Sequence, residues 1–173
     1  MESMIEFVHQ RIKKHKYQNG IDFTMGNGHD TLFLSEYCHH VYSYDIQSLA
    51  LNNTKELVKR KKNITLFLKS HEYFDEDVRD FEVGIFNLGY LPGGNHECVT
   101  QYEITLKTIK KALEHLVKGG CLYVVVYIGH DQGKESTNLD AYFRTLDHKL
   151  YNVAKFEMMN KKNAPYVVIV EKR

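Results

Sequence analysis

A glycine-containing loop is the first segment of this sequence that could hold a ligand. Gly26-Asn27-Gly28 follows the strand-like run 20–25, and a helix start follows at Asp30 or Thr31. Glycines leave backbone N–H groups accessible, so a ligand can approach the main chain closely. The dinucleotide fingerprint would need a third glycine where the chain has Thr31, which disfavours a bound pyrophosphate.

Two carboxylates accompany this loop. Asp45 ends the strand-like run 40–46, 17 residues after Gly28, where a carboxylate can accept both hydroxyls of a ribose. A solvated acid or a helix N-cap is the alternative for Asp45. Asp22 lies inside the first expected strand, where a lone charge is costly unless a cationic ligand or loop N–H groups satisfy it. S-adenosylmethionine (SAM) has an amino group, a ribose and a sulfonium, so carboxylates beside a glycine loop suit it better than they suit a phosphate.

A second polar group follows the strand-like run 81–89. The segment NLGYLPGG (87–94) places the Asn87 amide at the carboxyl edge of the predicted sheet and then turns the chain sharply. We expect Asn87 and the Leu88 carbonyl to face a planar, nitrogen-containing substrate, with Tyr90 as a stacking wall. A turn with a capping asparagine is the alternative.

A third group leaves the same edge after the strand-like run 121–128. Tyr127, His130 and Glu135 follow one another there, two strands away from the glycine loop. A solvated loop histidine and a functional one are equally compatible with His130.

Alternating strands and helices would position these groups. An amphipathic helix over about 2–16 has acidic residues early and basic residues late, as the helix dipole favours. Gly119 and Gly120 should stop the long helix before the apolar run 121–128, which indicates a central strand of a parallel sheet. Strands are predicted over 20–25, 40–46, 63–68, 81–89 and 121–128, and helices over 30–38, 47–61, 99–120 and 137–149.

The last two strand-like runs indicate the fold class. Runs 151–159 and 165–172 are separated by only five residues, which cannot hold a crossover helix, so they should form an antiparallel hairpin. A mostly parallel, seven-stranded α/β sheet that ends in such a hairpin, with helices on both faces, is the Rossmann-like architecture of class I methyltransferases. A nicotinamide-dependent oxidoreductase would normally keep its crossovers and is disfavoured.

Length and composition limit the class of protein. The 173 residues predict one domain with its own core, and 43% hydrophobic and 26% charged residues are ordinary for a soluble globular protein. No apolar run approaches the roughly 20 residues of a membrane span, so we expect no membrane partner. The cysteines are far apart and odd in number, which fits a reducing cytoplasm, so we expect a cytoplasmic protein. Cys38, Cys98 and Cys121 form no CxxC pair, which argues against a disulfide framework and a metal site.

With these segments in order, the chain resembles the bacterial methyltransferases of the YtqB/MnmM type, formerly labelled rRNA methylases. The resemblance rests on DFTMGNGHDTLFL, YDIQ, KSHE, FNLGYLPGG and YIGH..GKE, and it spans about residues 20–136. It implies transfer of a methyl group from SAM to the aminomethyl nitrogen of 5-aminomethyl-2-thiouridine at the wobble position of a tRNA. The implied partner is therefore a tRNA anticodon stem-loop.

The resemblance also implies roles for the matching residues. Cofactor-binding positions would be Asp22, Thr24, Gly26, Asn27, Gly28, His29, Asp30, Thr31, Asp45, Ile46, Gln47, Ser70, His71 and Asn87. Substrate-binding positions would be Leu88, Tyr90, Pro92, Gly93, Tyr127, His130, Lys134 and Glu135. The catalytic group would be Asn87, Tyr90, His130 and Asp30, with Asp30, His130 and His71 as candidate proton acceptors. The chain departs from the pattern at Asn95-His96, at Gln132 and at Ser136, which leaves Glu135 as the one acidic residue there.

Basic clusters are the candidate RNA contacts. The net charge is only +1, and the lysines and arginines gather at 11–16, 59–62, 161–162 and the terminal pair. The candidate phosphate contacts are Lys13, Lys14, Lys16, Lys134, Lys161 and Lys162. A homodimer is compatible with so small an RNA enzyme, although no feature requires one. The alternatives are a SAM-dependent enzyme acting on rRNA or a small amine, and a non-catalytic RNA-binding protein with a degenerate cofactor cleft.

Overall fold

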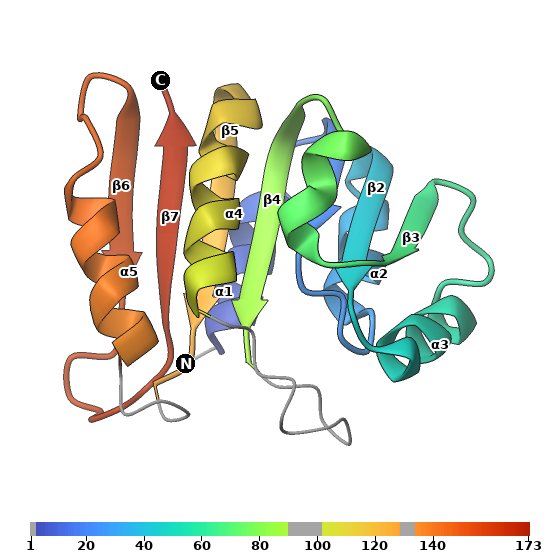
Figure 1. Cartoon of the computed structure of the whole chain (residues 1–173), viewed down its shortest axis with the longest axis horizontal. Helices are drawn as coiled ribbons and strands as arrows, with labels where there is room; N and C mark the ends of the chain where they lie inside the picture. Colours follow the sequence, from blue (N-terminus) through green and yellow to red (C-terminus); the bar gives the residue numbers. More distant parts are fainter. Residues whose placement is uncertain (1–2, 90–101, 129–133) are drawn as a thin grey trace.

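Five parallel strands and an antiparallel pair form one seven-stranded sheet in the order β3-β2-β1-β4-β5-β7-β6 (Figure 1). The computed structural model describes residues 3–89, 102–128 and 134–173. The strands are β1 (Tyr17–Asp22), β2 (Cys38–Asp45), β3 (Ile64–Leu68), β4 (Phe81–Leu88), β5 (Leu116–Val126), β6 (Tyr151–Phe156) and β7 (Tyr166–Lys172). The helices are α1 (Met4–Ile12), α2 (His29–Ser35), α3 (Ser48–Leu57), the 3-10 helix η1 (His71–Glu76), α4 (Tyr102–His115) and α5 (Lys134–Arg144).

Strand direction brings the polar groups to one edge of the sheet. Strands β1 to β5 pair in parallel, so their carboxyl ends share an edge, which we call the carboxyl edge. Asp22 ends β1 and Asp45 ends β2 at this edge. Strand β7 runs antiparallel to β5, with Tyr166 opposite Val126, so the turn between β6 and β7 lies at the carboxyl edge as well.

Alternation along the strands builds two apolar layers. Val83 and Ile85 of β4 pack in a cluster with the buried face of α1 and with Leu34 of α2. Phe86 and Leu88 point to the other face, into a cluster with α4 and α5. Figure 1 shows α4 and α5 in front of the sheet and α1 behind it. The helices therefore cover both faces, as predicted.

Helix α1 illustrates how local sequence sets an element. The Ser3 side chain accepts a hydrogen bond from the Glu6 backbone and the Glu6 carboxylate accepts one from Ser3, which forms a capping box. Met4, Val8 and Ile12 recur at helical spacing and are buried. The described residues include no helix long and apolar enough to cross a membrane.

The predicted sheet and terminal hairpin are confirmed, but several boundaries were wrong. Helix α4 ends at His115 rather than at Gly120, because buried Leu116 pairs with Phe81 and opens β5. The glycines instead lie in an irregular stretch of β5, where Gly119 has a φ of 80°. Strand β5 is not central in a parallel sheet, since its neighbours are parallel β4 and antiparallel β7.

Smaller differences lie near the glycine loop. Strand β1 covers 17–22 rather than 20–25, so Asp22 is its last residue and does not lie inside it. Helix α2 begins at His29 and is shorter than the predicted 30–38. The 3-10 helix η1 was not predicted.

Candidate cofactor and substrate site

The loop between β1 and α2 needs glycine for its own conformation. Gly26 has a φ of 52° and Gly28 a φ of 83°, both in the left-handed region. The Gly28 N–H donates to the Met25 carbonyl at 2.8 Å, and the Gly28 carbonyl accepts from Leu32 as α2 begins. A Cβ at position 28 would lie 2.6 Å from Oγ1 of Thr54. Helix α3 therefore explains Gly28 without any ligand, which the sequence interpretation did not foresee.

Asp45 supports this loop from the end of β2. Its Oδ2 accepts from the Gly26 N–H at 3.0 Å and its Oδ1 accepts from the Gln47 N–H at 2.9 Å. Burial raises the pKa of Asp45, although these N–H groups act in the opposite direction. Each carboxylate oxygen has a second lone pair, so Asp45 can still accept hydroxyl groups. The neighbouring Ile46 side chain is 60% exposed, an apolar surface beside the carboxylate.

Asp22 is satisfied from within the protein. Its Oδ1 accepts from the Thr24 N–H at 3.1 Å and its Oδ2 accepts from the Thr31 hydroxyl at 2.6 Å. The Thr31 hydroxyl also lies 2.7 Å from the Ser43 hydroxyl. Burial first, and then the negative charge of Asp30, raise the pKa of Asp22 to about 7. A cation bound nearby would stabilise the ionised form of Asp22.

Asp30 links the glycine loop to β4. The carboxylate is buried, and its Oδ2 accepts from Nδ2 of Asn87 at 3.1 Å. The Asn87 backbone N–H donates to the Thr24 hydroxyl at 2.7 Å, so the three predicted residues meet at the carboxyl edge. A carboxylate only accepts hydrogen bonds, which fixes Nδ2 toward Asp30 and leaves Oδ1 of Asn87 as an acceptor that no side chain of the described residues occupies.

The second oxygen of Asp30 has a partner that sequence reasoning missed. Nε2 of His9, in α1, lies 2.7 Å from Oδ1 of Asp30. His9 and Asp30 are 21 residues apart and belong to different helices, so no local pattern indicates the contact.

Tyr127 lies beside this group, where it was predicted. A Cβ added to Gly89 would be 3.6 Å from the Tyr127 ring, which places the ring against the end of β4. Burial first, and then the charge of Asp30, raise the pKa of Tyr127. The phenol therefore stays protonated at neutral pH. Leu88 is buried at the same strand end.

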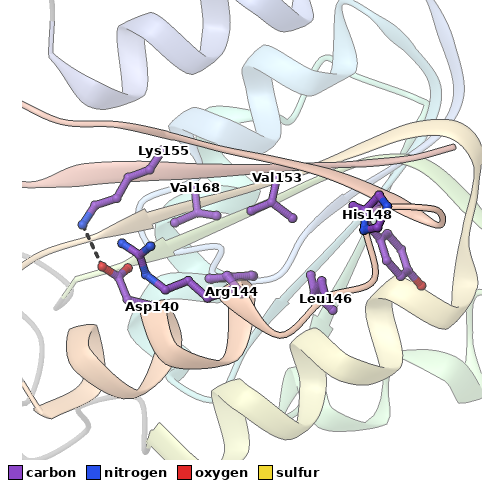
Figure 2. Close-up of a pocket in the computed structure, with 9 residues that line it drawn as sticks. Asp140, Arg144, Leu146, His148, Val153, Lys155 and Val168 are labelled. Carbon is purple, nitrogen blue, oxygen red and sulfur yellow. Dashed lines mark hydrogen bonds and ion pairs between the residues drawn. The ribbon is translucent and has the colours of Figure 1, made fainter.

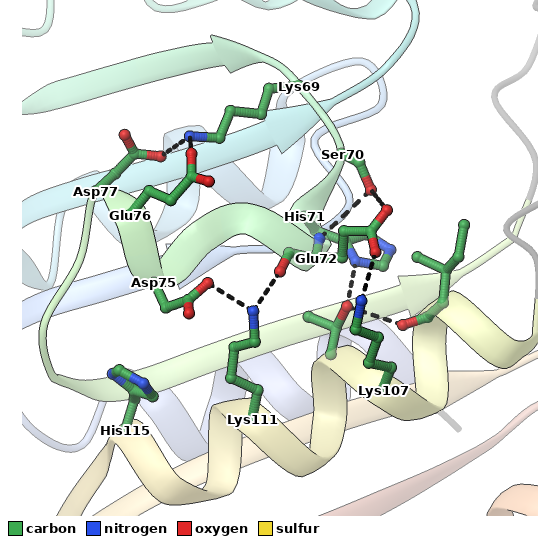
Figure 3. Close-up of polar contacts among 12 residues, drawn as sticks. Lys69, Ser70, His71, Glu72, Asp75, Glu76, Asp77, Lys107, Lys111 and His115 are labelled. Carbon is green, nitrogen blue, oxygen red and sulfur yellow. Dashed lines mark hydrogen bonds and ion pairs between the residues drawn. The ribbon is translucent and has the colours of Figure 1, made fainter.

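Ser70 and His71 follow β3 at the carboxyl edge (Figure 3). The Ser70 side chain caps η1 by accepting from the Glu72 N–H. Nδ1 of His71 lies 2.9 Å from the Thr108 hydroxyl, and burial lowers the pKa of His71 to about 4. The imidazole is therefore neutral at pH 7.

Two ion pairs fasten this segment to α4. Lys107 pairs with Glu72 at 3.1 Å and Lys111 pairs with Asp75 at 2.7 Å, as Figure 3 shows. Exposed ion pairs contribute little each, but together with the buried His71–Thr108 contact they fix the position of η1.

The remaining predicted residues are placed in part. Asn27 accepts from Asn53 of α3 at 2.9 Å, and His29 is exposed at the start of α2. Lys134 and Glu135 lie in the first turn of α5. Tyr90, Pro92, Gly93 and His130 lie outside the described residues, as do the departures at Asn95, His96 and Gln132. Within the described part of the chain, no group of three or more His, Cys, Asp or Glu side chains could hold a metal ion.

Residues 41–172 match the model of the family described as "Putative rRNA methylase". The chain belongs to this family. The resemblance found in the sequence is thus confirmed, and the fold of this rRNA methylase family member is the predicted class I methyltransferase fold.

Three relatives of this family member are informative. A "putative rRNA-methylase" from Clostridium thermocellum is 32% identical, with a TM-score of 0.94 over 100% of this chain and 99% of that one. A "putative methyltransferase" from Streptococcus mutans, in complex with SAH, is 36% identical, with a TM-score of 0.92 over 100% and 99%. The "tRNA (mnm(5)s(2)U34)-methyltransferase, chloroplastic" of Arabidopsis thaliana is 36% identical over 88% of this chain. This chain spans 62% of the length of that relative.

The rRNA methylase family member also has a pocket lined by α5, the segment that follows it and the β6–β7 hairpin. It measures about 320 Å³ and opens between α5 and the β6–β7 hairpin (Figure 2). Asp140, Arg144, Tyr151 and Lys155 are among its lining residues, and Lys155 pairs with Asp140 at 2.7 Å. Among the described residues, its lining includes none of the predicted site residues.

The basic clusters of this family member do not lie on one face. Lys16 precedes β1 at the amino edge of the sheet, where it donates to the Glu36 carbonyl, and Lys61 pairs with the Glu36 carboxylate. Lys161 and Lys162 lie in the turn between β6 and β7, at the carboxyl edge. Of these three clusters, the one at 161–162 lies at the same edge as Asn87 and Tyr127.

Proposed function

We propose that this protein transfers a methyl group from SAM to the aminomethyl nitrogen of 5-aminomethyl-2-thiouridine at the wobble position of a tRNA. Membership of a methylase family and 36% identity to the Arabidopsis tRNA methyltransferase support the reaction and the substrate. The Streptococcus mutans relative was solved with SAH, which supports the cofactor. The observation that carries the proposal is the Asn87 amide, held by Asp30 beside the glycine loop.

The residues at the carboxyl edge fit SAM. Asp45 would present carboxylate lone pairs to ribose hydroxyls, and exposed Ile46 would offer apolar surface to an adenine. The carboxyl groups of Asp22 and Asp30 lie beside the loop, where they would stabilise an amino group and a sulfonium, and such a cation would in turn favour the ionised form of Asp22. Bound SAM would supply the electrophilic methyl group.

The main contribution of the protein to methyl transfer would be to orient the substrate amine. Oδ1 of Asn87 would accept an N–H of the substrate amine and so aim its lone pair, because in-line transfer depends on positioning. Burial and a neighbouring cation both favour the neutral, nucleophilic amine. His71 is a weak proton acceptor, since its pKa is about 4. Tyr127 would pack beside the base.

The first test replaces Asn87 by alanine. We expect loss of turnover on an aminomethyl-containing anticodon stem-loop, with SAM affinity by calorimetry within about threefold of wild type, because the amide acts on the substrate. Asn152, an exposed residue of β6 that binds Glu171, provides the matched control as Asn152→Ala. Near-wild-type turnover of Asn87→Ala would remove the basis of the proposal.

The second test concerns the substrate. Stem-loops with 5-aminomethyl-2-thiouridine, with 5-aminomethyluridine and with plain uridine would be compared with an rRNA fragment and a free small amine. Methylation of the first two alone supports the proposal. The family description favours rRNA as the competing substrate, and methylation of the rRNA fragment alone would select it. Binding of RNA without any methyl transfer would identify a non-catalytic RNA-binding protein.

A further inference from the structure

Helix α1 places a histidine against the buried carboxylate of the site. Met4, Val8 and Ile12 fix the helix to the sheet, and the adjacent His9 turns toward α2. Its ring stacks on Phe33, with 3.7 Å between centroids and 9° between planes. The His9 side chain is only 23% exposed, and its Nε2 lies 2.7 Å from Oδ1 of Asp30. Stacking and hydrogen bond together leave the imidazole one orientation.

The Asp30 carboxylate connects His9 to Asn87. One carboxylate oxygen faces His9 and the other accepts from Asn87, so the two bonds together fix the plane of the carboxylate. Without the His9 bond, the carboxylate of Asp30 could rotate about its terminal torsion, which is soft in aspartate. Rotation would misalign the acceptor that holds the Asn87 amide.

We propose that His9 is a positioning residue of the methyl-transfer site. It donates Nε2–H to Asp30, Asp30 accepts Nδ2–H of Asn87, and Oδ1 of Asn87 thereby faces the substrate. The effect on turnover rests on the proposed function, whereas the effect on the Asn87 amide does not. The competing explanation is that the His9–Asp30 pair only fastens α1 to α2.

Two substitutions separate stacking from hydrogen bonding. His9→Phe keeps an aromatic ring against Phe33 but cannot donate, and His9→Gln can donate but cannot stack. We expect His9→Phe to lower kcat by about 10- to 100-fold, the scale of one hydrogen bond to a charged group, with SAM affinity within about threefold of wild type. His9→Gln should recover kcat to within about fivefold of wild type. His39 is exposed and belongs to β2, so His39→Phe is the matched control and should keep wild-type kcat.

A spectroscopic measurement makes the inference independent of the substrate. The side-chain ¹⁵N–¹H signals of Asn87 in the full chain should shift, and exchange faster with solvent, in His9→Phe but not in His9→Gln or His39→Phe. If wild-type protein fails to methylate any aminomethyl stem-loop, the proposed function fails and the Asn87 signals still decide the role of His9. Unchanged Asn87 signals in His9→Phe, or wild-type kcat in that variant, would overturn the inference. If His9→Phe does not fold, His9→Gln decides the question instead. Asn87 signals in His9→Gln that differ from those of the wild type would then overturn the inference.

Discussion

Replacing Gly28 by alanine should destabilise the protein by about 2–5 kcal/mol. The residue has a φ of 83°, where a side chain adds roughly 1–2 kcal/mol of backbone strain. The new Cβ would also lie 2.6, 2.7 and 2.9 Å from Oγ1, Cγ2 and Cβ of Thr54, and overpacking of this kind costs roughly 1–3 kcal/mol. Thr54 is buried and donates its hydroxyl to the Gly26 carbonyl, so it cannot move away without losing that bond.

Gly119→Ala is a matched control for the strain. Gly119 has a φ of 80°, and apart from its two chain neighbours no atom of the described residues lies within 4 Å of a Cβ added there. It should therefore show the backbone contribution alone, about 1–2 kcal/mol. Urea denaturation of both variants, followed by circular dichroism, gives the contact contribution as the difference between them.

A double variant completes the test. Thr54→Ala removes Oγ1 and Cγ2, so Gly28→Ala should be roughly 1 kcal/mol or more less destabilising in that background. Strictly additive effects, or equal losses in Gly28→Ala and Gly119→Ala, would refute the assignment of Gly28 to packing against α3. In that case, Gly28 would instead be explained by the approach of a ligand to the main chain.

Three further results are expected. The pKa of Asp22 is raised to about 7, so the folded protein binds this proton more tightly than the unfolded chain, and the stability it gives is lost as pH rises toward 7. Between pH 5 and 8, wild type should therefore lose on the order of 2–3 kcal/mol more stability than Asp22→Asn in urea denaturation, and equal pH dependences would contradict this. Asp45→Ala should weaken SAM binding by about 10- to 100-fold in calorimetry, and a change below twofold would argue against ribose recognition by this carboxylate. Alanines at the lysine pair 161–162 should flatten the salt dependence of stem-loop binding by up to about two units of slope, whereas the pair 13–14 at the amino edge should not, and the reverse result would place the RNA at the other end of the sheet.

The sequence predicted the sheet because its signals are local. Apolar runs, the short gap before β7 and the positions of Asp45 and Asn87 at strand ends need no tertiary information. The end of α4 was mispredicted because Leu116 suits a helix and a strand equally well, and its pairing with Phe81 decides between them. Likewise, the glycine spacing predicted a ligand loop, but its contact with α3 depends on how two helices pack.

Contacts across the chain could not be predicted in the same way. His9 is an ordinary polar residue of an amphipathic helix until the fold brings it to Asp30. The basic clusters look alike in sequence, but because of the strand directions Lys16 and Lys161 lie at opposite edges of the sheet. Charge composition alone therefore cannot indicate which cluster approaches an RNA bound at the carboxyl edge.

The strand order has a consequence for the newborn chain. Strand β7 separates β5 from β6, and in the described sheet it is the neighbour through which β6 is attached. Until residues 166–172 have left the ribosome, the buried run of β5 has an unpaired side and β6 has nothing to join. An unpaired apolar strand readily associates with other chains. A premature stop before Tyr166 should therefore yield insoluble, rapidly degraded polypeptide instead of a slightly shortened enzyme.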